Sequence, residues 1–164
     1  MSVRVGLGFD VHPFDPARPL VLGGVVIPDG PGLAGHSDAD AVAHAVTDAL
    51  LAAAGLPDLG TRFPASDPAH AGAASMGFVA SVATELAATG WTVGNVGVVV
   101  AAEQPRLAPH VAAIAAGVAA ALEPLRDPAD AVVAVSVTPK RGEGLGAVGR
   151  AEGIATWAVV LLQR

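Results

Sequence analysis

The chain has 164 residues, of which 52% are hydrophobic, and its 9 Lys plus Arg against 15 Asp plus Glu give a formal net charge of −6. This length suits a single domain, 1–164, with a substantial core. The longest smooth apolar run, 111–122, is too short for a bilayer span of about 20 residues, and the acidic balance argues against nucleic-acid binding. We therefore predict a protein that binds neither membrane nor nucleic acid.

The chain contains no cysteine, so disulfides and thiolate metal sites are excluded. The first predicted strand follows Met1 almost directly, which leaves no room for a signal peptide. These two features lead us to expect a cytoplasmic protein.

Apolar residues at the odd positions from Val3 to Val11 follow the two-residue period of a strand. Asp10 and His12 stand two residues apart at its end, so their side chains project from the same face. Two short apolar runs, 20–22 and 25–27, flank Gly23-Gly24 and predict a β-hairpin.

A helix is predicted from Ser37 to Gly55. Ser37 is expected to be the N-cap, with Asp40 three residues on as in a capping box, and Gly55 to end the helix. Its apolar stripe is Val42, Val46, Leu50 and Ala53, while Asp40, His44 and Asp48 share the opposite stripe.

The rest of the chain is predicted as loop over 56–71, helix over 72–89, strand over 91–102, helix over 109–122, and strands over 131–137 and 153–162. This order indicates an α/β (α+β) fold in two layers, with helices on one face of a mixed sheet. The last two strands are apolar on both faces. They therefore require a second layer, or another subunit, over the outer face.

Asp10, His12 and His44 are three potential metal ligands. A strand pair plus one helical histidine can give three-point ligation with an open fourth position, as in a catalytic zinc site. The alternative is two polar residues at a strand end and a surface histidine, because Asp-x-His is common by chance. Asp40 or Asp48 could orient a ligating imidazole, or could simply lie on a solvated helix face.

Two segments could bind phosphate. His36-Ser37 precedes the predicted helix, whose N-terminal N–H groups favour an anion, although Ser37 could be only a cap. Gly142 to Gly146 is glycine-rich and follows Lys140-Arg141, so it could cradle phosphates while Glu143 holds a divalent cation, or be a flexible turn. It lacks the Gly-Lys-Ser/Thr of a P-loop, which excludes that nucleotide site. Together these features predict metal-assisted phosphate chemistry.

Several motifs occur in the order typical of one family: Gly6-Leu7-Gly8-Phe9-Asp10-Val11-His12-Pro13-Phe14, Gly35-His36-Ser37-Asp38 with His44, Asp58-Leu59-Gly60 with Phe63-Pro64, Gln104-Pro105-Arg106, Glu143-Gly144-Leu145-Gly146, and Gly149-Arg150-Ala151-Glu152-Gly153. Over nearly its whole length the chain resembles the 2-C-methyl-D-erythritol 2,4-cyclodiphosphate synthases of non-mevalonate isoprenoid biosynthesis.

This resemblance implies a homotrimer with its sheets toward the axis and active sites between subunits. It implies a lyase in which the 2-phosphate of 4-diphosphocytidyl-2-C-methyl-D-erythritol 2-phosphate attacks the β-phosphorus and expels CMP. Zn²⁺ would be held by Asp10, His12 and His44, and Mg²⁺ or Mn²⁺, which accompanies the substrate, by Glu143.

The resemblance also implies roles for other residues. His36 and Arg141 would be catalytic, and His36 and Ser37 would bind phosphates. The remaining substrate contacts would be Asp58, Leu59 and Gly60 with Phe63 to Asp67 at the erythritol, Ala102, Arg106, Leu107 and Ala108 at the cytosine, Lys140, Arg141, Gly142 and Glu143 at the diphosphate, and Ala147, Arg150 and Glu152 near the trimer axis.

Three positions depart from the family pattern. Arg141 stands where the family has a threonine, Ala147 replaces a phenylalanine, and Ala65 replaces an aspartate. The Lys140-Arg141 pair leaves open a zinc phosphoesterase that hydrolyses a related nucleotide. Ala147 leaves open a non-catalytic trimer that binds an isoprenoid phosphate.

Overall fold

The computed structural model describes residues 2–28 and 30–164. Its main sheet has the strand order β4 (Gly32–Leu33), β1 (Val3–Asp15), β7 (Gly153–Gln163), β5 (Thr92–Ala101) and β6 (Val135–Lys140). Only β5 and β6 are parallel neighbours, so the sheet is mixed, as predicted. The predicted hairpin is also confirmed, since β2 (Leu20–Leu22) pairs with β3 (Val25–Ile27) in a sheet of their own.

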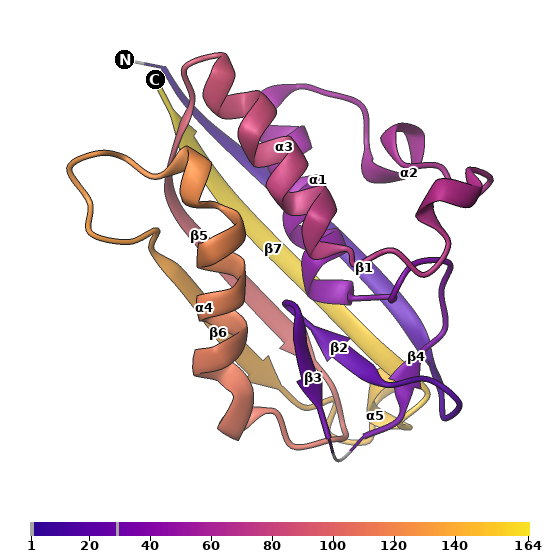
Figure 1. The fold of residues 1–164 in the computed structure, drawn as a ribbon. Helices are drawn as coiled ribbons and strands as arrows, with labels where there is room; N and C mark the ends of the chain where they lie inside the picture. The colour runs from indigo at the N-terminus through magenta and orange to yellow at the C-terminus, as the bar shows by residue number, and fades with distance from the viewer. Residues whose placement is uncertain (1, 29) are drawn as a thin grey trace.

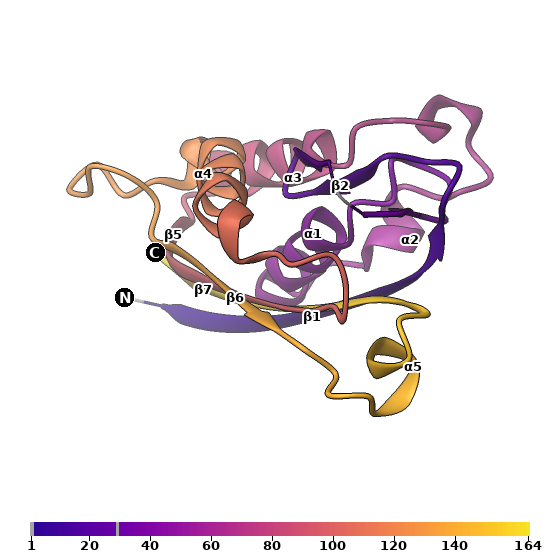
Figure 2. The ribbon, with the colours of Figure 1, turned by 90° about the horizontal axis from the view of Figure 1, so that it is seen from below.

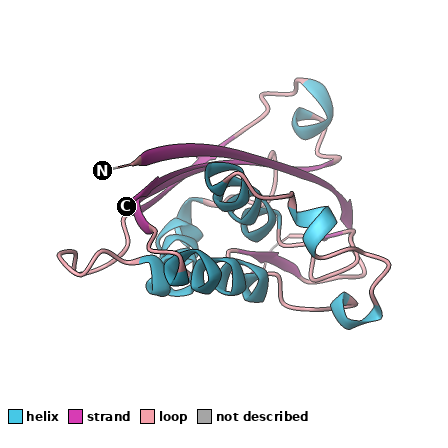
Figure 3. Cartoon of the chain, turned by 90° about the horizontal axis from the view of Figure 1, so that it is seen from above, coloured by secondary structure: helices cyan, strands magenta, loops and turns pink. Residues whose placement is uncertain are grey.

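Helices α1 (Ala41–Ala54) and α4 (Val111–Ala121) pack on one face of the main sheet, and α3 (Met76–Ala88) lies on the same side and packs against α1 and α4 (Figures 1 and 2). The short helix α5 (Gly146–Gly149) lies on the opposite side (Figures 2 and 3), where the sequence predicted no helix. Four further helical turns are α2 (Leu59–Arg62), η1 (Pro68–His70), η2 (Ala108–His110) and η3 (Glu123–Leu125). No helix in the described part of the chain has both the length and the apolar character needed to cross a membrane.

Helix α1 lies unusually close to strand β1. A Cβ atom added to Gly6 would stand 2.0 Å from the carbonyl oxygen of Ala49, and one added to Gly8 would stand 1.9 Å from that of Ala45. Because only glycine leaves room for this approach, the two residues let the helix backbone rest directly on the strand. The contact brings the part of α1 that carries His44 against the end of β1.

The outer face of the sheet is apolar and open. Five alternate residues of β1 are 49–64% exposed there: Val3, Val5, Leu7, Phe9 and Val11. Trp157 of β7 joins them, with its ring centroid 5.2 Å from that of Phe9. So large an apolar surface is rare on a monomer. The coverage of the outer face by another layer or subunit, expected from the last two predicted strands, therefore stays a prediction that now includes β1.

Some predicted boundaries were wrong. Helix α1 begins at Ala41 with Asp40, not Ser37, as its N-cap, because Ala39 has a φ of 57°, outside the helical region. Strand β6 covers 135–140 instead of 131–137, since its pairing with β5 begins at Val135 and Val132 is 70% exposed. Pro139 fits within this strand because β6 lies at the sheet edge. Helix α3 begins four residues later than predicted, and α2 and η1 lie within the predicted loop 56–71.

We expect Gly8→Ala to lower the free energy of unfolding by at least about 1–3 kcal/mol, because the new methyl group meets helix backbone that cannot rotate away. The matched control is Gly97→Ala in β5, where the nearest atom to the added Cβ is Oγ of Ser136 at 3.8 Å. Urea unfolding of both variants measures the difference. Equal midpoints for Gly8→Ala and Gly97→Ala would contradict the close approach of α1 to β1.

Candidate metal centre

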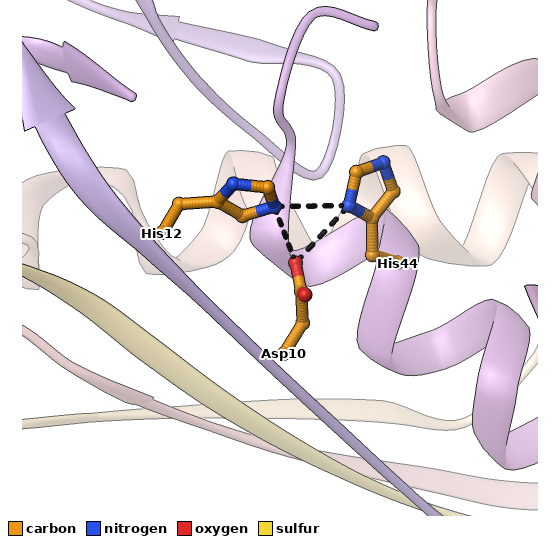
Figure 4. A group of neighbouring side chains, drawn as sticks. All are labelled: Asp10, His12 and His44. Carbon is orange, nitrogen blue, oxygen red and sulfur yellow. Dashed lines mark hydrogen bonds and ion pairs between the residues drawn. The ribbon is translucent and has the colours of Figure 1, made fainter. Parts of the chain in front are cut away.

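The close packing of α1 on β1 brings Asp10, His12 and His44 together (Figure 4). Oδ2 of Asp10 lies 2.8 Å from Nε2 of His12 and 3.0 Å from Nδ1 of His44. The two ring nitrogens are 3.2 Å apart. These are one carboxylate oxygen and two imidazole nitrogens, a donor set that suits zinc and related divalent ions.

Both histidine rings are held by groups behind them. Nδ1 of His12 donates to the carbonyl oxygen of Ala34 at 2.6 Å. Since a carbonyl only accepts, Nε2 of the neutral His12 ring carries a lone pair toward the centre. Nε2 of His44 lies 2.9 Å from Oγ of Ser75, which leaves Nδ1 facing Asp10. Such support of the remote nitrogen is usual for metal-ligating histidines.

The electrostatics of the group favour a bound cation. Burial by itself raises the pKa of Asp10, but hydrogen bonds with His12 and His44 outweigh it and lower that pKa to about 2. Burial opposes protonation of His12, yet its bond to Asp10 leaves the His12 pKa raised. The ionised carboxylate of Asp10 and the ring nitrogens beside it therefore favour a positive charge between them. A proton or a metal ion could supply that charge.

The three ligands form part of the wall of a cavity of about 250 Å³. Six other predicted site residues also line it, namely His36, Ser37, Leu59, Gly60, Phe63 and Ala65. Two of its wall residues, His70 and Phe78, were not predicted. Phe63 stacks on Phe78 at 4.5 Å, and the His70 ring meets both edge-on. No short-range sequence pattern indicated His70 or Phe78, because they come next to Phe63 only when the chain between α2 and α3 has folded.

Two predicted substrate residues lie outside this cavity. Asp58 accepts a hydrogen bond from the Thr61 hydroxyl, which lowers the Asp58 pKa, and it lines a separate hollow beside Asp48. Asp67 accepts from the amide of Ala69 as the N-cap of η1. In this structure both carboxylates serve local turns.

The two acidic residues that share the His44 stripe of α1 hold other elements. Asp48 accepts from the amide of Leu59 at 2.7 Å and so positions α2. Asp40 is fully buried and accepts from the amides of Val42 and Ala43 in α1, and from those of Gly23 and Gly24 in the hairpin turn. The sequence leaves two roles open for Asp40, to orient an imidazole or to lie on a solvated helix face. Asp40 has neither role, because it is buried and caps α1.

The predicted nucleotide residues gather around a second cavity of about 430 Å³. Its wall includes Ala102, Glu103, Arg106, Leu107, Ala108, Lys140 and Arg141, and it shares no lining residue with the first cavity. Arg141 donates to Glu103, which also accepts from the amide of Gly142 at 3.1 Å. The hydrogen bond from Arg141 lowers the pKa of Glu103.

The remaining predicted site residues line neither of these two cavities. Glu143 follows Gly142 and has a φ of 52°. The group of possible metal ligands in the described part of the chain consists of Asp10, His12 and His44 and does not include Glu143. Ala147 belongs to α5. Arg150 donates to Glu152 at 2.6 Å beside the same helix.

The fold and the site define a class: an α/β protein in which an Asp–His–His group that could hold a metal ion lies beside a partly aromatic cavity. Residues 3–163 match the YgbB family, and the chain belongs to this family. It is 47% identical over 168 residues to the 2-C-methyl-D-erythritol 2,4-cyclodiphosphate synthase of Thermosynechococcus vestitus. The aligned region covers 99% of this chain and 98% of that protein. The resemblance read from the motifs is thereby confirmed.

Solved structures agree in fold. A 2C-methyl-D-erythritol-2,4-cyclodiphosphate synthase in a CDP-bound form superposes with a TM-score of 0.83 at 35% identity, over 98% of this chain and 100% of that one. The bifunctional IspDF from Campylobacter jejuni gives a TM-score of 0.87 at 36% identity, over 98% of this chain and 42% of the bifunctional chain.

Asp40 predicts a pH dependence of stability. Burial raises its pKa to about 6, against the opposing effect of its backbone hydrogen bonds, while the ordinary value in the unfolded chain is 3.8. Between about pH 4 and pH 6 the unfolded chain therefore releases this proton first, and the contribution of Asp40 to stability falls as pH rises.

Asp40→Asn should lack this slope, although it is less stable overall because its amide group faces backbone N–H donors. The measurement is the free energy of unfolding in urea at pH 4, 5, 6 and 7, with exposed Asp130→Asn as the control. Parallel pH profiles for the wild type and Asp40→Asn would contradict the raised pKa.

Proposed function

We propose that this protein converts 4-diphosphocytidyl-2-C-methyl-D-erythritol 2-phosphate to 2-C-methyl-D-erythritol 2,4-cyclodiphosphate and CMP, in isoprenoid biosynthesis. The observation that carries the proposal is the meeting of one carboxylate oxygen and two ring nitrogens, none more than 3.2 Å from another, at the wall of a cavity. Membership of the YgbB family and the names of the matched synthases support it.

Zinc is the proposed ion of the centre, with Asp10, His12 and His44 as its protein ligands. Three nitrogen and oxygen donors with one position left for substrate are the usual set of a catalytic zinc. When bound, such an ion supplies positive charge that polarises a phosphoryl oxygen.

The chemistry is an intramolecular phosphoryl transfer. An oxygen of the 2-phosphate forms a bond to the β-phosphorus, the bond from that phosphorus to the bridging oxygen breaks, and CMP departs with the α-phosphate. Positioning and charge neutralisation supply most of the acceleration in such reactions. His36 and Ser37 line the cavity beside the centre, where they would hold phosphate oxygens.

The other cavity residues suit the carbon skeleton of the substrate. Phe63 and Phe78 form an apolar wall, and the turn Leu59-Gly60 closes one side. Oδ1 of Asp58 accepts from Thr61, so Oδ2 would be the acceptor for an erythritol hydroxyl.

A homotrimer with active sites between subunits would join the two cavities of this chain. One substrate carries both a cytidine and a reacting diphosphate, whereas the metal centre and the cavity lined by Arg106 and Lys140 share no lining residue. A neighbouring subunit that docks its second cavity beside the first would bring them together. The exposed apolar face of β1 and β7 supports such an assembly, with the sheets toward the axis.

The cationic residues of the second cavity suit a diphosphate. Lys140, Arg141 and Arg106 concentrate positive charge in a chain whose net charge is −6. Glu143 would hold Mg²⁺ or Mn²⁺ that enters with the substrate, since carboxylates are preferred ligands of these ions.

Purified protein supplied with zinc, magnesium and the substrate should release CMP and the cyclic diphosphate in equal amounts. Phosphorus NMR distinguishes the cyclic product from an open-chain diphosphate. An open-chain product would favour a hydrolase instead. Absence of both products from fully zinc-loaded protein would overturn the proposed function.

His44→Ala should lose most of the bound zinc and abolish cyclisation, because two protein ligands rarely hold the ion. His110→Ala is the matched control, since His110 lines neither cavity and makes no capping hydrogen bond. Metal analysis of the dialysed proteins gives the zinc content per chain. A His44→Ala protein that keeps one zinc per chain would show that the ligands are wrongly assigned.

A further inference from the structure

Behind His44 lies a set of polar side chains, Ser37, Ser75 and Asp38, of which the proposed reaction uses only Ser37. Nε2 of His44 is 2.9 Å from Oγ of Ser75 and 3.2 Å from Oγ of Ser37, and the two hydroxyl oxygens are 2.9 Å apart. The Ser75 hydroxyl donates to Oδ1 of Asp38 at 2.5 Å. Ser75 is fully buried and Ser37 is only 6% exposed, so solvent has little access to these contacts.

The carboxylate of Asp38, which ends this series of hydrogen bonds, fixes their direction. A carboxylate only accepts, and a serine hydroxyl has a single proton to donate. Ser75 gives that proton to Asp38, so its oxygen must accept from its other neighbours. Nε2 of His44 is therefore the protonated nitrogen, and Nδ1 carries the lone pair that faces Asp10 and His12.

Further contacts hold the same arrangement. The amide of Ser75 donates to Oδ2 of Asp38 at 3.1 Å, so both carboxylate oxygens are engaged by one residue. Oγ of Ser37 accepts from the amide of Ala39 at 3.3 Å, which directs the Ser37 proton toward Ser75. Arg18 donates to the carbonyl oxygens of Gly35 and Ser37 and so fixes the loop that carries Ser37.

The two ligating histidines are thus oriented by different devices. His12 depends on one main-chain carbonyl, that of Ala34, which no side-chain substitution removes. His44 depends on Ser75, the residue just before α3, and on Asp38, three residues before the start of α1. Its support comes from side chains and can be tested by substitution.

We propose that Ser75 and Asp38 are positioning residues of the metal centre, which hold His44 with Nδ1 as the ligating nitrogen and so set the affinity for zinc. The inference rests on the zinc site of the proposed function. Loss of partners that orient a metal-ligating histidine typically costs 10–100-fold in metal affinity.

The test is the dissociation constant for zinc, measured by competition with a chromophoric chelator in the absence of substrate. Ser75→Ala should bind zinc roughly 10–100-fold more weakly than the wild type. Ser75→Thr keeps the hydroxyl and should retain most of the affinity. Ser81→Ala, on the exposed side of α3, is the matched control and should bind as the wild type does.

A spectroscopic readout separates this role from general packing. In zinc-loaded protein labelled with ¹⁵N-histidine, the Nε2–H proton of His44 should exchange slowly with water, because Ser75 accepts it in a buried position. In Ser75→Ala the same proton should exchange faster. Asp38→Asn removes the charge that draws the Ser75 proton while it keeps the side-chain size, and should weaken zinc binding about tenfold.

Wild-type zinc affinity in a folded Ser75→Ala protein would overturn the proposal. Equal losses in Ser75→Ala and Ser75→Thr would assign the effect to packing and would also overturn it. If Ser75→Ala does not fold, Asp38→Asn decides, and unchanged affinity there counts against the proposal. Tight zinc binding with these variant effects but without cyclisation would overturn the proposed function and leave the roles of Ser75 and Asp38 standing.

Discussion

The direct contact between α1 and β1 is the constraint on which the rest of the site depends. Asp10 and His12 belong to the strand and His44 to the helix, so their separation is set by how closely the two backbones approach. Gly6 and Gly8 allow carbonyl oxygens of α1 to occupy space that any Cβ would fill. Metal ligands tolerate displacements of only about 0.5 Å, so a methyl group at either glycine would disturb the centre as well as the packing.

Asp40 fixes the start of α1 relative to the β2–β3 hairpin. Its carboxylate accepts from two amides at the start of the helix and two in the turn of the β2–β3 hairpin. Burial makes ionisation of this group costly and raises its pKa to about 6. The hairpin and the helix therefore share one buried acid, and His44 lies one turn beyond it.

Short-range patterns in the sequence predicted most of the fold and the three candidate metal ligands, Asp10, His12 and His44. Strand alternation put Asp10 and His12 on one face, and helix periodicity put His44 on α1, because both signals depend on neighbours a few residues away. The predicted Ser37 cap failed since the competing partners of Ser37 and Asp40 are distant: Ser75 lies 38 residues from Ser37, and Gly23 lies 17 from Asp40. No local pattern contains such pairs. For the same reason the sequence could not choose between an imidazole-orienting role and a solvated helix face for Asp48, which in the structure accepts from the amide of Leu59.

Arg141, which stands where the resemblance leads us to expect a threonine, is held in place by its surroundings. A threonine offers a short neutral donor, whereas a guanidinium brings charge on a long flexible chain whose ordering costs entropy. Glu103 reduces that cost in advance, because its carboxylate accepts from Nε and Nη2 of Arg141 and from the amide of Gly142. Nη1 has no partner among the described residues and remains available to an anion. The carboxylate of Glu103 also offsets part of the positive charge of Arg141. To a diphosphate in this cavity, Arg141 would therefore offer a hydrogen-bond donor with a fixed direction as much as a charge.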